Sequence, residues 1–204
     1  EEDNVDDELN TAWTIETVRG TVIAIILFLG APFIASLFNE PAATDLFRVI
    51  ALSPLIVGLQ NPAVVYFQKS LDFHKEFVYK VSGAVAYFGV TVGLALYDPT
   101  VYALAIGYIA GDVARFIISY LADGYRPWPS FDIDVAKKRY SFGKWVTVNS
   151  ILFFLYSRGD DAFVGWALMA SALGFYQLAY RLSNAPATEI THTISSVTFS
   201  AYSK

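Results

Sequence analysis

The sequence contains no cysteine, so neither disulfide bonds nor thiolate metal sites are possible. Histidine is almost as scarce, since His74 and His192 are the only two and lie too far apart in the chain to suggest a metal site. The chain also lacks a P-loop, a dinucleotide-binding fingerprint, an HExxH motif and a GxSxG nucleophile elbow. No pattern therefore predicts an enzyme, a cofactor or a bound metal.

Charged residues are scarce as well. They make up 16% of the 204 residues, against about 25% in an average soluble domain, whereas 55% are hydrophobic and the mean hydropathy is +0.44. A net charge of −5 and the absence of a dominant basic cluster argue against nucleic acid as a partner, because neutralising phosphates requires grouped Lys and Arg. This composition indicates a membrane protein.

The first ten residues, EEDNVDDELN, are acidic and polar and do not resemble a signal peptide. The sequence begins at Glu1, and its only methionine is Met169. We therefore expect this chain to be a fragment of a longer one.

Apolar segments recur along the whole chain. A helix needs roughly 20 mostly apolar residues to cross a bilayer core about 30 Å thick. Six segments meet or approach this length: 21–38, about 49–67, about 77–97, about 100–122, about 143–169, and one that starts near 172 and continues toward 199. The sequence therefore predicts an all-α polytopic membrane protein with about six transmembrane helices.

The links between these segments alternate in charge. Residues 39–45, the turn at 97–100 and the join near Ala170 contain no Lys or Arg, whereas Lys and Arg occur in all the other links. Short basic loops stay in the cytoplasm. The links that contain Lys or Arg are therefore predicted to lie in the cytoplasm, and the links without them on the other side of the membrane. A buried soluble helical domain, the alternative, would match this alternation only by accident.

The longest link covers residues 123–143 and contains Pro127 and Pro129, which forbid a continuous helix. An amphipathic stretch follows around 133–140 and suits either a helix on the lipid headgroups or a solvated linker. In both cases it marks a boundary between lobes. We expect residues 1–126 to form about four spans of an N-terminal lobe, 127–142 a cytoplasmic linker, and 143–204 the first two spans of a C-terminal lobe.

Ionisable residues inside the spans are the candidates for function, because they are costly in a membrane and usually face a bundle interior or a watery cavity. Spacing of i, i+3 puts Arg158 and Asp161 on one face of a helix, with Asp160 pointing elsewhere, and pairs Asp112 with Arg115 in the same way. The sixth segment adds a further stripe of polar residues. The candidate cavity residues are Arg158, Asp161, Arg181, Arg115, Asp112, Glu189 and His192.

Other interpretations of these charges remain open. Each acid and base pair could be an internal clamp that never touches a substrate. Residues 157–161 (SRGDD) could instead form a turn outside the membrane, although 145–155 alone would be too short to span it as a helix. A proton relay through Asp161, Glu189 and His192 is conceivable, but no motif supports it.

Residues 141–187 carry a family resemblance. They begin with Phe142 and Gly143, continue with Asp161 followed by Gly165, and end on LGFYQLAYRL at 173–182. The segments TAWTIETVRG (11–20), 48–73 and GYRPWPSFD (124–132) fit the same pattern. In order and spacing, the chain resembles the polysaccharide exporters of the multidrug/oligosaccharidyl-lipid/polysaccharide flippase superfamily, which include the O-antigen flippases.

The resemblance implies an inner-membrane transporter of twelve or more helices in two lobes around a central cavity. Such proteins move lipid-linked sugars to the outer face by alternating access. The expected partners are a polyprenyl-(di)phosphate-linked sugar, the bilayer and the remaining helices of the full-length chain. Relatives more often carry an Asn and one Asp where this chain has SRGDD, so an ion-coupling role of Asp161 does not follow. An ion-coupled drug antiporter of the same superfamily, a membrane glycosyltransferase or polymerase, and a non-transporting scaffold are the alternatives.

Overall fold

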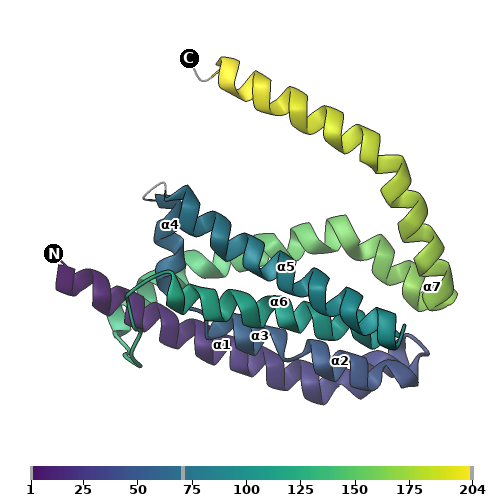
Figure 1. The fold of residues 1–204 in the computed structure, drawn as a ribbon, viewed down its shortest axis with the longest axis horizontal. Coiled ribbons are helices and arrows are strands. Elements are labelled where there is room, and N and C mark those ends of the chain that lie inside the picture. The colour runs from purple at the N-terminus through teal and green to yellow at the C-terminus, as the bar shows by residue number, and fades with distance from the viewer. Residues whose placement is uncertain (1, 70–71, 203–204) are drawn as a thin grey trace. The chain divides into compact units, whose positions relative to one another are not determined.

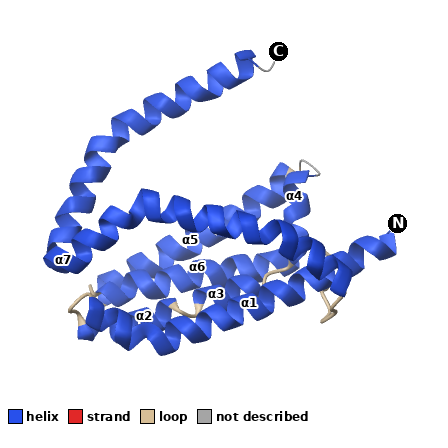
Figure 2. Cartoon of the chain, turned by 180° about the vertical axis from the view of Figure 1, so that it is seen from behind, coloured by secondary structure: helices blue, strands red, loops and turns tan. Residues whose placement is uncertain are grey.

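The computed structural model describes the backbone of residues 2–69 and 72–202, and their side chains except at 2–7, 68–69, 134, 138–140, 142 and 185–202. Within this described part every regular element is a helix, and Figure 2 shows only helices and loops. The predicted all-α fold is therefore confirmed.

The first helix, α1 (Glu2–Leu37), contains the first predicted span. Its residues 8–37 are long and apolar enough to cross a membrane. Pro32 lies inside this helix without ending it, as neighbouring groups in membrane helices often allow. The chain turns at Asn39, whose φ of 56° is a left-handed conformation that Asn tolerates better than most residues.

The second span is a broken helix. It consists of the 3₁₀ turn η1 (Pro41–Ala43), α2 (Thr44–Ile50) and α3 (Ser53–Gly58), and its spanning stretch covers residues 41–58. The predicted second span, about 49–67, therefore began about eight residues too late along the chain. Asn61 and Pro62 interrupt the chain, and the segment after them forms η2 (Pro62–Val64) and α4 (Val65–Lys69).

Helices α5 (Phe73–Tyr97) and α6 (Val101–Leu121) are joined by a short turn and pack along their length. Asp98 is extended, and Pro99 cannot continue a helix, so the two helices run antiparallel. Figure 1 shows α1, α2, α3, α5 and α6 side by side. These elements form the helical layer that holds the first candidate site.

Small residues on one face of α6 allow this close packing. Ala103, Gly107 and Gly111 recur every fourth residue and are all buried. A β-carbon on Gly111 would lie 2.9 Å from the carbonyl oxygen of Gly83 on α5. Such contact between backbones is common where helices associate in membranes. Arg115 is the next residue on the same face.

The predicted proline-containing link has no regular structure from 123 to 132. It is followed by α7 (Ile133–Tyr202), a run of 70 helical residues interrupted at Met169, where φ is 71° and ψ is 168°. The predicted join near Ala170 therefore corresponds to a sharp kink in the chain. Residues 157–161 are helical, which excludes the alternative of a turn at SRGDD.

Five helical stretches in the described part are long and apolar enough to cross a membrane, where about six were expected. The fifth covers residues 143–184, which includes the predicted fifth span and the start of the sixth. Its 42 residues would extend about 63 Å as one straight helix, roughly twice a bilayer core. Between 6% and 28% of the most apolar window in each stretch is buried, so most of these side chains are available to lipid or to other helices.

The chain divides into two compact units. One consists of residues 1–36 and 41–146, and the other of residues 37–40 and 147–204. The sites within each unit are described separately below.

Candidate functional site

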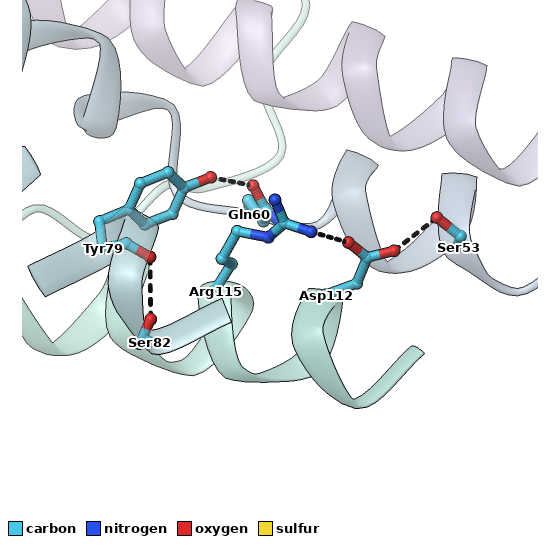
Figure 3. Close-up of polar contacts among 6 residues, drawn as sticks. All are labelled: Ser53, Gln60, Tyr79, Ser82, Asp112 and Arg115. Carbon is cyan, nitrogen blue, oxygen red and sulfur yellow. Dashed lines mark hydrogen bonds and ion pairs between the residues drawn. The ribbon is translucent and has the colours of Figure 1, made fainter. Parts of the chain in front are cut away.

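The first candidate site is centred on Asp112, a carboxylate buried in the middle of α6 with 2% of its side chain exposed. Arg115 donates to its Oδ1 at 2.7 Å, and the Ser53 hydroxyl donates to its Oδ2 at 2.5 Å. Figure 3 shows the carboxylate held between these two side chains. The i, i+3 spacing correctly predicted the ion pair, whereas the partner on α3 lies 59 residues away in sequence.

Arg115 lies across the glycine of the neighbouring helix. A β-carbon on Gly83 would lie 2.8 Å from Arg115 Cγ, so a larger residue at this position would displace the arginine side chain. Its Nε is buried without a hydrogen-bond partner, while 37% of the side chain is exposed. The guanidinium is therefore anchored through Asp112 and still has unused donor capacity.

A cleft of about 310 Å³ opens beside Arg115. It is lined by Lys80, Gly83, Ala84, Tyr87, Tyr108, Gly111 and Arg115. Two cations line it and no carboxylate does, because Asp112 is buried behind Arg115. Lys80 also forms an ion pair of 2.5 Å with Glu76, one turn earlier on α5. Both cations of the cleft are therefore already paired with a carboxylate, and the unpaired Nε of Arg115 is the donor left over.

A second polar contact lies close to this cleft. The Tyr79 hydroxyl donates to Gln60 Oε1 at 2.6 Å and so connects α5 to the break after α3 (Figure 3). Sequence reasoning missed Gln60, Tyr79 and Ser53. Ser53 and Gln60 carry no charge, and only their contacts across helices distinguish them from other polar residues in the spans.

The second candidate site lies in the unit that contains residues 147–204. Arg158 and Asp161 form the predicted i, i+3 pair, with 3.3 Å between Nη1 and Oδ2. The arginine side chain is 62% exposed and the aspartate 18%. Asp160, to which the sequence assigned no partner, accepts a hydrogen bond of 2.7 Å from the Tyr176 hydroxyl beyond the Met169 kink.

Three predicted residues remain, Arg181, Glu189 and His192. Arg181 is exposed and makes no hydrogen bond or ion pair with any side chain that the structure describes. Glu189 and His192 lie outside the residues whose side chains are described. The described side chains include no group of three or more His, Asp or Glu that could hold a metal ion.

Comparison with known proteins identifies the family. The model of the family described as "Polysaccharide biosynthesis protein" matches residues 1–204. The lipopolysaccharide biosynthesis protein WzxC of Escherichia coli (strain K12) is 26% identical over 199 residues, which are 97% of this chain and 40% of the relative. The teichuronic acid biosynthesis protein TuaB of Bacillus subtilis (strain 168) is 24% identical over 206 residues, 100% of this chain and 42% of the relative.

An uncharacterized membrane protein in the cps region of Klebsiella pneumoniae is 23% identical over 201 residues, 97% of this chain and 41% of the relative. No solved structure matches the chain. The chain thus spans about two fifths of the length of these relatives. With its membrane-spanning helices and a family model that matches from end to end, this chain belongs to the polysaccharide biosynthesis protein family and is a multi-pass membrane protein.

Proposed function

We propose that the protein moves a lipid-linked oligosaccharide or polysaccharide intermediate across the inner membrane by alternating access. In this proposal residues 1–126 belong to one lobe, 127–142 to a cytoplasmic linker and 143–204 to the second lobe. The polyprenyl tail of the cargo stays in lipid, while its (di)phosphate and sugars pass through a polar cavity. Such a cavity requires cations for the phosphates and mixed donors and acceptors for the hydroxyls.

One observation carries the proposal. In the two ion pairs that the sequence predicted, the carboxylate is the more covered partner and the arginine the more exposed one. The exposed fractions are 2% for Asp112 against 37% for Arg115, and 18% for Asp161 against 62% for Arg158. Each carboxylate holds its arginine in place without covering it. This favours a guanidinium that contacts a substrate over one that only links two parts of the protein.

Family membership supports the same conclusion. WzxC and TuaB are named for lipopolysaccharide and teichuronic acid biosynthesis, and the family itself for polysaccharide biosynthesis. No P-loop, zinc motif or nucleophile elbow favours the alternative of a membrane glycosyltransferase or polymerase. We therefore propose a transporter without catalytic activity of its own.

The test is an export assay in cells that depend on this protein for their surface polysaccharide. We expect Arg158→Ala and Asp161→Ala to reduce surface polysaccharide much more than Lys137→Ala, which changes an exposed cation at the start of α7. Protein abundance in the membrane must be matched. Equal polysaccharide levels in all three variants would contradict the proposal, as would normal polysaccharide combined with lost efflux of cationic drugs in a deletion strain.

A further inference from the structure

The lysines at the start of α7 differ from most cations of the chain. The structure describes ten Lys and Arg side chains, and six of them pair with a carboxylate three or four residues away. The other four are Arg126, Lys137, Lys144 and Arg181. Arg126 donates to two backbone carbonyls of its own link. Lys137 and Lys144 form no ion pair with any carboxylate that the structure describes.

These two lysines belong to a basic stretch in an acidic chain. Residues 133–146 contain four cations and one acid, which leaves a charge of +3 in a chain whose net charge is −5. The cations are Lys137, Lys138, Arg139 and Lys144. No Asp or Glu occurs within four residues of Lys144. The stretch is therefore complementary to an anionic partner.

Lys137 and Lys144 lie on one exposed face of α7. The residues of this face follow one another at spacings of four, four and three, which align along one side of a helix. They are Ile133, Lys137, Ser141 and Lys144, and all four are exposed. The opposite side is partly covered at Val135, Ala136 and Gly143. Two ammonium groups about 10 Å apart along the helix are therefore presented outside the protein.

Continuity of the chain places this face at the membrane surface. The fifth spanning stretch begins at Gly143, so Lys144 lies in its first turn and Lys137 about 9 Å before it. Each headgroup region of a bilayer is about 5–8 Å thick, within reach of a long lysine side chain. In the link before α7, Trp128 and Phe131 are 75% and 64% exposed and lie outside every spanning stretch. Exposed aromatic rings beside basic residues are typical of the cytoplasmic interface.

We propose that this face of α7 binds anionic phospholipids of the cytoplasmic leaflet, with Lys137 and Lys144 at the headgroup phosphates. An anionic headgroup offers both lysines a net negative charge, whereas a zwitterionic headgroup offsets its phosphate with a cation of its own. The face lies at the edge of the membrane, so the inference does not depend on the proposed function. Lys137→Ala by itself leaves Lys144 in place and remains the milder variant of the export assay.

The test measures which lipids surround this face. Ser141 is exposed between the two lysines, and Ser141→Cys as the only thiol of the protein accepts a bimane fluorophore. The labelled protein is placed in phosphatidylcholine vesicles that contain brominated phosphatidylglycerol or, in parallel, the same fraction of brominated phosphatidylcholine. Bromine quenches bimane only at short range, so the ratio of the two quenching constants gives the preference for the anionic lipid. We expect Lys137→Gln and Lys144→Gln each to lower this preference about fivefold.

The matched control is the double variant Lys75→Gln and Lys80→Gln. It removes two other exposed lysines, each of which already has a carboxylate partner, and should leave the preference unchanged. The double variant Lys137→Arg and Lys144→Arg keeps both charges and should keep the preference. Equal quenching by the two brominated lipids in the unsubstituted protein would overturn the proposal. Equal losses in the Lys75, Lys80 pair and the Lys137, Lys144 pair would do the same, because they would indicate a general effect of charge.

Two further outcomes identify other occupants of the face. If millimolar glycerol phosphate removes the preference while sodium chloride of equal ionic strength does not, the lysines bind a soluble phosphate and the assignment to lipid is wrong. If the purified protein shows no preference but the Ser141→Cys thiol is protected from labelling in native membranes, the face belongs to a protein partner. That result would also overturn the proposal.

Discussion

Gly20 of α1 and Gly58 of α3 bring two helix backbones into direct contact. A β-carbon on either glycine would lie 3.3 Å from the α-carbon of the other. A β-carbon on Gly58 would also lie 2.6 Å from the carbonyl oxygen of Glu16. The Thr17 hydroxyl donates to the Gly58 carbonyl at 3.0 Å across the same contact. The contact fixes the position of α3, and therefore of Ser53 at its start.

The first prediction concerns this helix contact. Gly58→Ala should lower the free energy of unfolding by about 1–3 kcal/mol, because the added methyl group must push two backbones apart. Gly30→Ala on α1 is the control, since a β-carbon there meets nothing within 4 Å. Alanine favours helix over glycine, so this control should be neutral or slightly stabilising. Thermal unfolding of both variants in the same detergent provides the comparison, and equal midpoints would contradict the prediction.

The second prediction concerns the hydrogen bond between Ser53 and the buried Asp112. Ser53→Ala leaves one carboxylate oxygen without its donor and should cost about 1–3 kcal/mol of stability. Ser36→Ala is the control, because the Ser36 hydroxyl is exposed and bonds only to the Phe33 carbonyl of its own helix. In a double-mutant cycle with Asp112→Ala, the Ser53 substitution should have little further effect on the unfolding midpoint. Additive losses would show that the two side chains act independently.

The third prediction concerns the link at 123–132, which is held against α1 by side chains that accept backbone N–H groups. Asn10 Oδ1 accepts from Trp128 at 2.8 Å, Thr14 from Ser130 at 3.1 Å and Thr11 from Asp132 at 3.2 Å. The Asn10 oxygen also accepts from the Tyr125 hydroxyl at 2.6 Å. The backbone N–H groups of Trp128, Ser130 and Asp132 are therefore all hydrogen-bonded to side chains of α1.

We expect Asn10→Ala to release this link and to raise hydrogen exchange in residues 125–132, because two of the bonds end on that side chain. Mass spectrometry of deuterium uptake on the purified protein measures the change. Thr21→Ala provides the control, since the Thr21 hydroxyl bonds to Thr17 within α1. An unchanged uptake in Asn10→Ala would mean that the link is held by other contacts.

Local spacing and hydropathy were sufficient to predict the helical membrane fold and both i, i+3 ion pairs. Asp112 with Arg115, and Arg158 with Asp161, are close because one helix turn brings them together. Hydropathy alone set the second span about eight residues too late. Residues on both sides of the break at Asn61 are apolar, so the average does not reveal where a helix ends.

The sequence could not reveal contacts between distant segments. Ser53 and Asp112 meet only because α3 packs against α6, and Tyr176 reaches Asp160 only because the helix bends at Met169. The charge pattern placed a join near Ala170, but methionine is an uncommon residue at positive φ, so no turn residue indicated how sharply the chain bends there. The cleft beside Arg115 was hidden for the same reason, since its lining residues come from two helices.

The last prediction tests the membrane orientation on which the proposed function depends. Because the chain has no cysteine, a single introduced cysteine is the only thiol in it that can be labelled. Thr100 is exposed in the turn between α5 and α6, and its side chain caps no helix. Gly124 is exposed in the link after α6, and a β-carbon there meets nothing within 4 Å. Both positions should accept cysteine without disturbing the fold.

With the basic links in the cytoplasm, a membrane-impermeant maleimide should label Thr100→Cys in intact cells and Gly124→Cys only after permeabilisation. Equal labelling of denatured protein shows that both variants are present at the same level. The reverse pattern would place Arg115 near the outer leaflet, which is the wrong face for uptake of a cargo from the cytoplasm. Labelling of both positions in intact cells would mean that α6 does not cross the membrane, and the interpretation of Asp112 and Arg115 as intramembrane charges would fail with it.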